Sequence, residues 1–332
     1  MSKEVSHTVT LAENGLRLDI FLARVAGYGV RTAKRLAGDG HVTVDGKPRP
    51  AHFKLTAGAI VEVREPSAPL ADAPIVTVAV TDGYIAFAKP PGLHTAAIAG
   101  LATPSLEEAL AGQWSAIRAE LPGTPPTQLF SGALHSGSSL IPALLAPFLG
   151  GVAQEAIHVS FSQTLPPTPP ELLSRLDAET SGLVLAALSP HAAERFRKME
   201  ASGETQKYYL AVVHGTVSEP FAVRNALDTD NRKKTRALPE ETTDTTRHSA
   251  VFPIGNAREH VPGAQENTTL VAVRIQRGAR HQIRAHLAHA GYPILGDALY
   301  GTGKTGATMY LHHARLVFPG FEAFRLPPWL LI

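Results

Sequence analysis

The sequence predicts an α+β fold, with a mixed sheet in its larger part and a small α/β unit near the N-terminal end. The strand-like and helix-like segments do not alternate regularly, which argues against a doubly wound parallel sheet. The 332 residues exceed one average domain. Hydrophobic residues make up 44% of the chain and charged residues 18%, so the composition can fill a core.

Residues 15–65 are the basic part of the chain. They hold nine Lys and Arg against five Asp and Glu, whereas the whole chain has a formal net charge of only +2. The cations include Arg31, Lys34 and Arg35, which share one predicted helix. A local excess of positive charge favours a surface that faces nucleic acid.

Hydrophobic spacing and turn residues predict the elements of this basic unit. Leu18, Phe21, Leu22 and Val25 recur at helical spacing, and a second helix over 30–37 ends at Gly38. Two short strands are expected, one running into a turn at Asp45-Gly46 and one over residues 59–63.

Changes in composition divide the rest of the chain. A Pro- and Ala-rich stretch predicts a linker at 67–74, between a domain over 1–66 and a larger domain over 75–332. Residues 101–168 hold few charges and many Pro, Gly and Ser, which predicts an insertion with one or two helices and long loops.

The second half of the chain has clearer periodicity. Ser189 and Pro190 are typical of a helix start, and Gly203 lies beyond the end of that helix. The expected strands are one within 84–92 that is stopped by Pro90, Pro91 and Gly92, and those over 182–188, 208–215 and 269–275. A further helix lies within 281–291 and is stopped by Gly291.

The sequence also excludes several classes of site. The chain has no cysteine, which rules out disulfides, thiolate zinc sites, iron–sulfur clusters and a cysteine nucleophile. Residues 1–10 are polar, unlike a signal peptide, and no stretch of 18 apolar residues occurs. We therefore expect a soluble, cytoplasmic protein that binds no membrane.

Asp177 lies two residues after Arg175, at the entry to an apolar strand. A neighbouring guanidinium favours the ionised form of a carboxylate, and an ionised, positioned Asp can act as a nucleophile. The structural alternative is an Asp that caps a turn and pairs with Arg175. On residue types alone, that alternative is the commoner one.

Residues 274–289 combine cations with histidines. Arg274, Arg277, Arg280 and Arg284 occur there without an acid, so they predict a nearby phosphate or catalytic carboxylate, or else a solvated basic face. His281, His286 and His289 do not have the spacing of a metal-binding His-Glu-x-x-His helix. Core or RNA-facing histidines are the favoured interpretation, and we predict no metal site.

Tyr208 and Tyr209 occupy adjacent positions in an expected strand, so their side chains should point to opposite faces. One could line a cleft, or both could pack in cores. A serine-rich stretch at 131–139 lacks the Gly-x-Ser-x-Gly pattern of a hydrolase after a strong strand, so a serine hydrolase is rejected.

Together, five segments resemble the RluA family of RNA pseudouridine synthases, in the order of the family's motifs. Residues 175–182 (RLDAETSG) resemble its active-site signature, and 207–215 (KYYLAVVHG) and 281–301 (HQIRAHLAHAGYPILGDALYG) resemble two further motifs. Residues 88–95 and 311–316 resemble the opening and closing motifs of its catalytic domain. Ser174 stands where the family usually has His, and Ala279 where it usually has Arg.

The basic N-terminal unit resembles an S4 domain, a small RNA-binding fold. The matching segments are GLRLDIFL (15–22), VRTAKRL (30–36) and GHVTVDG (40–46). The two resemblances together imply a catalytic domain with a mixed or antiparallel sheet, flanked by helices and loops, joined to an RNA-binding domain.

The resemblance implies isomerisation of uridine in RNA by an Asp nucleophile, without cofactor or metal. It implies catalytic roles for Asp177, Tyr209 and Arg284, in which Tyr209 stacks on the uracil and helps to remove the C5 proton. It implies supporting roles for Arg175, Thr180, His281 and Gln282. The predicted RNA contacts are Arg17, Arg31, Lys34, Arg35, Lys89, Arg277 and Arg280.

The RNA partner is expected to be ribosomal rather than transfer RNA, because of the S4-like unit, and the protein is expected to be a monomer. A non-catalytic RNA-binding or ribosome-assembly factor on the same fold is the main alternative. A metal-dependent hydrolase is a more distant one.

Overall fold

The structure is a computed structural model of the chain. It describes residues 4–25, 30–38, 41–64, 74–97, 103–121, 165–231, 233–303 and 308–330. The chain divides into two compact units, Met1–Ala73 with Ala96–Ala109, and Pro74–Thr95 with Leu110–Ile332. Most of the predicted linker and of the predicted insertion lies outside the described residues, and the predicted domain boundaries stay predictions.

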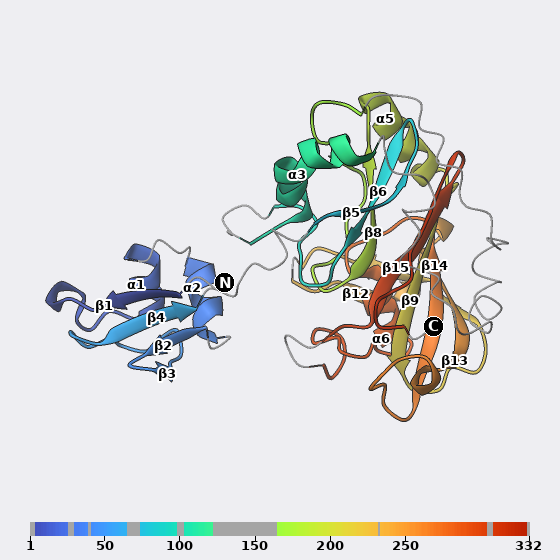
Figure 1. The fold of residues 1–332 in the computed structure, drawn as a ribbon. Helices are drawn as coiled ribbons and strands as arrows, with labels where there is room; N and C mark the ends of the chain where they lie inside the picture. The colour runs from blue at the N-terminus through green and yellow to red at the C-terminus, as the bar shows by residue number, and fades with distance from the viewer. Residues whose placement is uncertain are drawn as a thin grey trace. The chain divides into compact units, whose positions relative to one another are not determined.

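The first unit packs two helices on a four-stranded antiparallel sheet, as Figure 1 shows in blue. The sheet order is β1 (Glu4–Thr8), β4 (Ile60–Arg64), β2 (Val42–Val44) and β3 (Lys47–Pro48), and the helices are α1 (Leu18–Arg24) and α2 (Val30–Gly38). Leu18, Phe21 and Leu22 are fully buried, which confirms the helical face read from their spacing. Val25 follows the last residue of α1 and is 40% exposed, so its assignment to that face was wrong.

The second unit is built on a ten-stranded mixed sheet. Its main order is β10-β13-β14-β9-β15-β8-β6-β5, with β16 beside β15 and β7 beside β8. The described strand pairs of this sheet are antiparallel except β8 with β15, which is parallel. The bounds are β5 (Val76–Val80), β6 (Tyr84–Lys89), β7 (Glu171–Leu172), β8 (Ser181–Ala187), β9 (Gln206–His214), β10 (Phe221–Val223), β13 (Ser249–Asn256), β14 (Thr268–Ile275), β15 (Leu311–Phe318) and β16 (Phe321–Phe324).

Helices and a separate hairpin complete this unit. The hairpin pairs β11 (Asn225–Asp228) with β12 (Arg236–Glu241). The described helices are α3 (Leu106–Glu120), which belongs to this unit from Leu110 on, α5 (Pro190–Ala201) and α6 (Gln282–His289), with short turns at Thr245–Arg247 and Ala257–Glu259. The α5 start is as predicted, since the Ser189 hydroxyl accepts a hydrogen bond from the Ala192 amide at 3.2 Å. The α+β class is confirmed.

Hydrophobic side chains lie on both faces of the ten-stranded sheet. Along β9, Tyr209, Ala211 and Val213 pack with Ile283 and Leu287 of α6, whereas the alternate residues belong to another cluster. This alternation confirms that neighbouring tyrosines of β9 point opposite ways. It also fixes α6 against the face that carries Tyr209.

Gly182 allows β8 and β15 to approach closely where the sheet becomes parallel. Its φ is +116°, and a Cβ added there would lie 2.4 Å from the carbonyl oxygen of His313. Beside it, the Ser181 hydroxyl lies 2.8 Å from Nδ1 of the buried His312. The backbone that leaves the 177–180 turn is therefore fixed against β15.

We predict that Gly182→Ala lowers the free energy of unfolding by more than about 1 kcal/mol, because the new Cβ meets backbone and the φ is unfavourable for L residues. The measurement is urea unfolding followed by circular dichroism. Gly112→Ala in α3 is the matched control, since open space surrounds that position and Ala favours a helix. Equal stability of the two variants would contradict the close approach.

Candidate active site

Asp177 lies in a turn held from both sides by residues 89–95. The Thr95 hydroxyl donates to the Leu176 carbonyl at 2.9 Å and accepts from the Leu176 amide at 3.0 Å. On the other side, the Gly92 amide donates to the Ala178 carbonyl at 2.7 Å. The peptides before and after Asp177 are thus both anchored, which fixes where its carboxylate points.

Lys89 strengthens this anchor from inside the protein, which corrects its predicted RNA contact. The residue is 1% exposed, and its ammonium donates to the carbonyls of Pro90, Leu93 and Ala178 at 2.9, 2.8 and 3.0 Å. Burial lowers the pKa of Lys89 to about 7, against the opposing effect of the Asp177 and Glu179 carboxylates. With three donors engaged by backbone, Lys89 has none left for a phosphate.

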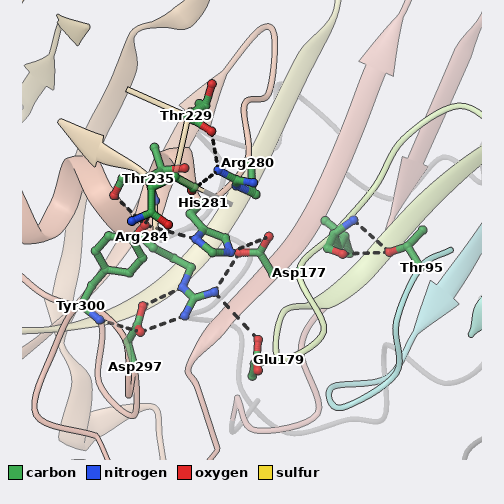
Figure 2. Close-up of polar contacts among 12 residues, drawn as sticks. Thr95, Asp177, Glu179, Thr229, Thr235, Arg280, His281, Arg284, Asp297 and Tyr300 are labelled. Atoms are coloured by element: carbon green, nitrogen blue, oxygen red, sulfur yellow. Dashed lines mark hydrogen bonds and ion pairs between the residues drawn. The ribbon is translucent and has the colours of Figure 1, made fainter. Parts of the chain in front are cut away.

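Arg284 of α6 lies between two carboxylates. Its Nη1 donates to Oδ2 of Asp177 at 2.9 Å, while Nε and Nη2 donate to Oδ2 and Oδ1 of Asp297 at 2.7 and 2.9 Å. Figure 2 shows this arrangement, with Glu179 at 3.8 Å on the outer side. The Arg284 side chain is 5% exposed and that of Asp177 19%, so the guanidinium is the buried partner and the nucleophile candidate remains reachable.

Asp297 is fully buried, and our sequence reasoning gave it no role. Its carboxylate also accepts the amides of Leu299 and Tyr300, at 2.8 and 3.0 Å. Burial alone would raise the pKa of Asp297, but hydrogen bonding from Arg284 and that residue's charge lower it below the ordinary value. Chemistry could have indicated a residue of this kind, because a buried guanidinium has five donors and needs a second acceptor besides Asp177.

His281 is the residue that precedes α6, and it also faces Asp177. Its Nε2 lies 3.7 Å from Oδ1 of Asp177, and its Nδ1 lies 3.1 Å from the Tyr300 hydroxyl. Its φ is +53°, a left-handed conformation that is uncommon for residues other than glycine. Burial lowers the pKa of His281, against the opposing charge of Asp177.

Tyr209 borders the same site from β9. Its ring stacks on that of His313, with centroids 4.5 Å apart, and only 8% of the residue is exposed. Burial raises the pKa of Tyr209, and the charges of Asp177 and Glu200 add to the effect. Leu176, next to Asp177, packs against the cluster that contains Tyr209, so the two site segments are in contact.

The four arginines of residues 274–284, which are close together in the sequence, have different surroundings in the structure. Arg284 meets the carboxylates, and Arg280 donates to the carbonyls of Thr229 and Asn231 at 2.6 and 2.5 Å. Arg274 lies over the Phe252 ring at 5.9 Å, and Arg277 is half-buried. Only Arg284 therefore meets the carboxylate that the pattern predicted.

Arg175 is exposed, and the guanidinium that pairs with Asp177 is that of Arg284 instead. Thr180 is buried, and its amide donates to the Asp177 carbonyl at 3.1 Å, which closes the turn. The Gln282 amide group donates to the Arg247 carbonyl at 2.7 Å and accepts from the Ala279 amide at 2.9 Å. These contacts hold the start of α6 in place.

In the N-terminal unit, Arg17 forms a bidentate ion pair with the buried Asp19. Its Nε and Nη2 donate to Oδ1 and Oδ2 of Asp19 at 3.1 and 2.9 Å. The Arg17 side chain is still 46% exposed. Lys34 is exposed on α2, whereas the side chains of Arg31 and Arg35 lie outside the described residues.

Within the described residues, no group of three or more His, Asp or Glu could hold a metal ion. His286, one of the histidines of the metal interpretation, uses both ring nitrogens on Ser249 and the Asn225 carbonyl, at 2.9 and 3.0 Å. Among the helices described, none is long and apolar enough to cross a membrane.

Comparison with known proteins adds to this geometry. Residues 160–289 match the family model described as RNA pseudouridylate synthase, and residues 16–61 match the S4 domain. Over residues 160–289 the chain is therefore similar to the RNA pseudouridine synthases. Asp177 and Arg284 both lie inside the matched synthase segment, and an S4 domain covers most of the basic N-terminal unit.

Curated relatives of the chain carry names of the same kind. It is 30% identical over 148 residues to the uncharacterized RNA pseudouridine synthase YjbO of Bacillus subtilis, covering 44% of this chain and 50% of that protein. It is 32% identical to tRNA pseudouridine synthase C of Vibrio cholerae, covering 46% and 62%. It is 33% identical to ribosomal large subunit pseudouridine synthase C of Buchnera aphidicola, covering 40% of each. The chain thus spans about half the length of the curated relatives it matches.

A solved structure has a similar fold. The chain resembles human RNA pseudouridylate synthase domain containing 1 with a TM-score of 0.50 and 17% identity, covering 77% of this chain and 84% of that one. At that identity, the likeness concerns the fold alone.

Both residues that depart from the family motifs, Ser174 and Ala279, have hydrogen-bond partners in the structure. The Ser174 hydroxyl accepts a hydrogen bond from the Leu185 amide at 2.9 Å, which ties the turn to β8. At the other position, the Ala279 amide is held by Gln282. Neither replacement interrupts the contacts between Arg284 and Asp177.

We predict that Asp297→Asn destabilises the protein by about 3 kcal/mol, because it leaves a buried guanidinium without its main counter-charge. Urea unfolding at neutral pH measures the change. Glu194→Gln is the matched control, because Glu194 forms an exposed ion pair with Lys198 and its loss should change stability little. Similar unfolding midpoints for both variants would show that Asp297 is not the anchor of Arg284.

Proposed function

We propose that this protein isomerises uridine in RNA to pseudouridine, with Asp177 as the nucleophile. The observation that carries the proposal is the partly exposed Asp177 carboxylate, aimed by an anchored turn and bound through Oδ2 by the buried Arg284. The match of residues 160–289 to the RNA pseudouridylate synthase model supports the reaction class. The proposed enzyme is an isomerase that acts within one RNA strand.

In this reaction the N1–C1′ bond breaks, the uracil turns, and C5 joins C1′. Substrate and product have the same atoms and the same oxidation state, so we propose that the reaction uses no cofactor or metal. With Oδ2 bound by Arg284, Oδ1 is the oxygen that acts on the substrate. Arg284 keeps the carboxylate charged and oriented.

Tyr209 is proposed to contact the uracil through the exposed edge of its ring. Thr180 and Gln282 support the turn and the start of α6 through the hydrogen bonds described above. Arg175 is exposed next to the turn, so we propose that it contacts the RNA. A paired uridine is hidden in a helix, so the target must be flipped out or lie in a loop.

The RNA-binding proposal rests on the S4 match and its charge. Arg17, Arg31, Lys34 and Arg35 are proposed to bind phosphates, with Arg277 and Arg280 near the catalytic site. We favour ribosomal over transfer RNA because of the S4 domain, although relatives are named for both kinds of RNA. We further propose a cytoplasmic monomer.

We predict that Asp177→Asn lowers pseudouridine formation by at least about 10⁴-fold while RNA binding is retained. Asn keeps the size and an oxygen for Arg284, but it is not a nucleophile. The assay measures release of tritium from RNA labelled at uridine C5, and a gel shift measures binding. Asp177→Glu keeps the charge but moves the carboxylate by one methylene, so it should fail as well. Normal turnover by Asp177→Asn would end the assignment.

We predict that the triple variant Arg31→Ala, Lys34→Ala and Arg35→Ala weakens RNA binding and reduces the slope of log affinity against log salt, because phosphate contacts release counterions. Filter binding over a series of salt concentrations tests it. The matched control removes Arg195, Arg197 and Lys198, three exposed cations of α5. An unchanged slope in the first triple variant would exclude α2 from the RNA contact.

A non-catalytic RNA-binding factor is the second candidate, and the family match does not favour it. The tritium-release assay separates the two functions, since a binding factor releases none. A metal-dependent hydrolase would need bound metal, which elemental analysis of the purified protein measures.

A further inference from the structure

The hydrogen bonds around Tyr300 determine which nitrogen of His281 carries a proton. The Tyr300 hydroxyl donates its single hydrogen to the Thr235 carbonyl at 2.8 Å and accepts from the Thr235 amide at 2.9 Å. It can therefore only accept from Nδ1 of His281, 3.1 Å away. The proton is on Nδ1, so Nε2 of the neutral ring is unprotonated and can accept a proton.

The unprotonated Nε2 of His281 faces Asp177, the proposed nucleophile. Nε2 of His281 lies 3.7 Å from Oδ1 of Asp177, the oxygen that Arg284 does not hold. A neutral imidazole and a carboxylate face each other there with two acceptors and no hydrogen to share. A proton released by the substrate can therefore bind between these two acceptors. Figure 2 shows His281 between Tyr300 and Asp177.

The surroundings keep His281 neutral and in place. The charged groups that act on it are the carboxylates of Asp177 and Asp297 and the guanidiniums of Arg284 and Arg280, two of each sign, and burial lowers its pKa. The left-handed backbone of His281 holds the ring in this orientation although it is unfavourable for the residue. Strain of this kind is concentrated at functional positions.

We propose that His281 is the catalytic base that removes the C5 proton of the uracil after C5 has joined C1′. This inference rests on the proposed function. Whether Asp177 attacks C1′ or C6, either atom is one bond from C5 in the product, so the C5 hydrogen arrives beside Oδ1 and Nε2. If Asp177 attacked C1′, the C5–H electron pair forms the C5=C6 bond, the C6=N1 pair moves to N1, and N1 takes a proton from the imidazolium or from water. If Asp177 attacked C6, the C5–H pair forms the C5=C6 bond while the C6–O bond breaks and the Asp177 carboxylate leaves.

Asp177 supports this step without being the base. When Nε2 takes the proton, His281 becomes a cation 3.7 Å from the Asp177 carboxylate, and opposite charges attract at that distance. Tyr209 suits the role less well. Its pKa is raised by burial and by Asp177, so its hydroxyl keeps its own proton and cannot accept another.

The test is His281→Asn, assayed on transcripts of the source organism's ribosomal and transfer RNAs made with either ordinary or 5-deuterated uridine. Asn tolerates the left-handed backbone, and its amide can still donate to Tyr300, but it offers no basic nitrogen. We expect a rate loss of about 10²-fold or more. We also expect a primary deuterium isotope effect in the variant that is larger than in the wild type, because C5–H cleavage becomes the slow step.

The control variant His289→Asn changes the exposed histidine of the same helix and should behave as the wild type. A slow His281→Asn enzyme with no added isotope effect would mean a merely structural role and would overturn the proposal, as would an unaffected rate. An isotope effect in Tyr209→Phe instead would assign the base to Tyr209. If the wild-type protein itself forms no pseudouridine from any transcript, the proposed function fails, and that outcome is distinct from failure of this inference.

Discussion

One buried guanidinium organises the site. Arg284 could not remain charged inside the protein without counter-charges, and it has two of different kinds. Asp297 is fully buried, holds two nitrogens of Arg284 and accepts two backbone amides, so it is a fixed structural partner. Asp177 receives the remaining nitrogen and stays partly open to solvent. The same cation therefore links the protein interior to the reacting carboxylate.

Three distant segments of the chain have to meet for this arrangement. Residues 89–95 form hydrogen bonds with the turn around Asp177, and the close approach at Gly182 fixes the strand that follows the turn. The third segment is α6 with the residue before it, which places Arg284 and His281 beside Asp177. The parallel pairing of β8 with β15 is what lets the turn end beside β9, where Tyr209 lies. Positioning by backbone hydrogen bonds and strand pairing is more exact than positioning by flexible side chains.

The sequence was sufficient for most elements and for the pair of Asp177 and Arg284, because periodicity and ordered motifs report local structure. It misassigned Lys89, since a lysine before Pro-Pro-Gly resembles a surface cation, and the three carbonyls that bury it come from the fold. It gave no role to Asp297, although the motif containing it was recognised. Both cases depend on contacts between segments, which no single stretch of sequence records.

The same limit applies to His281, whose role depends on a proton that the Thr235 backbone places through Tyr300. That dependence has a chemical consequence. A carboxylate bound by a guanidinium is stabilised as an anion, so it serves as a nucleophile but accepts protons poorly. A neutral imidazole beside it has the opposite properties, because it gains a favourable ion pair when protonated. In the proposed reaction, dividing the two tasks between Asp177 and His281 would leave the ion pair of Arg284 with Asp177 intact while His281 removes the C5 proton.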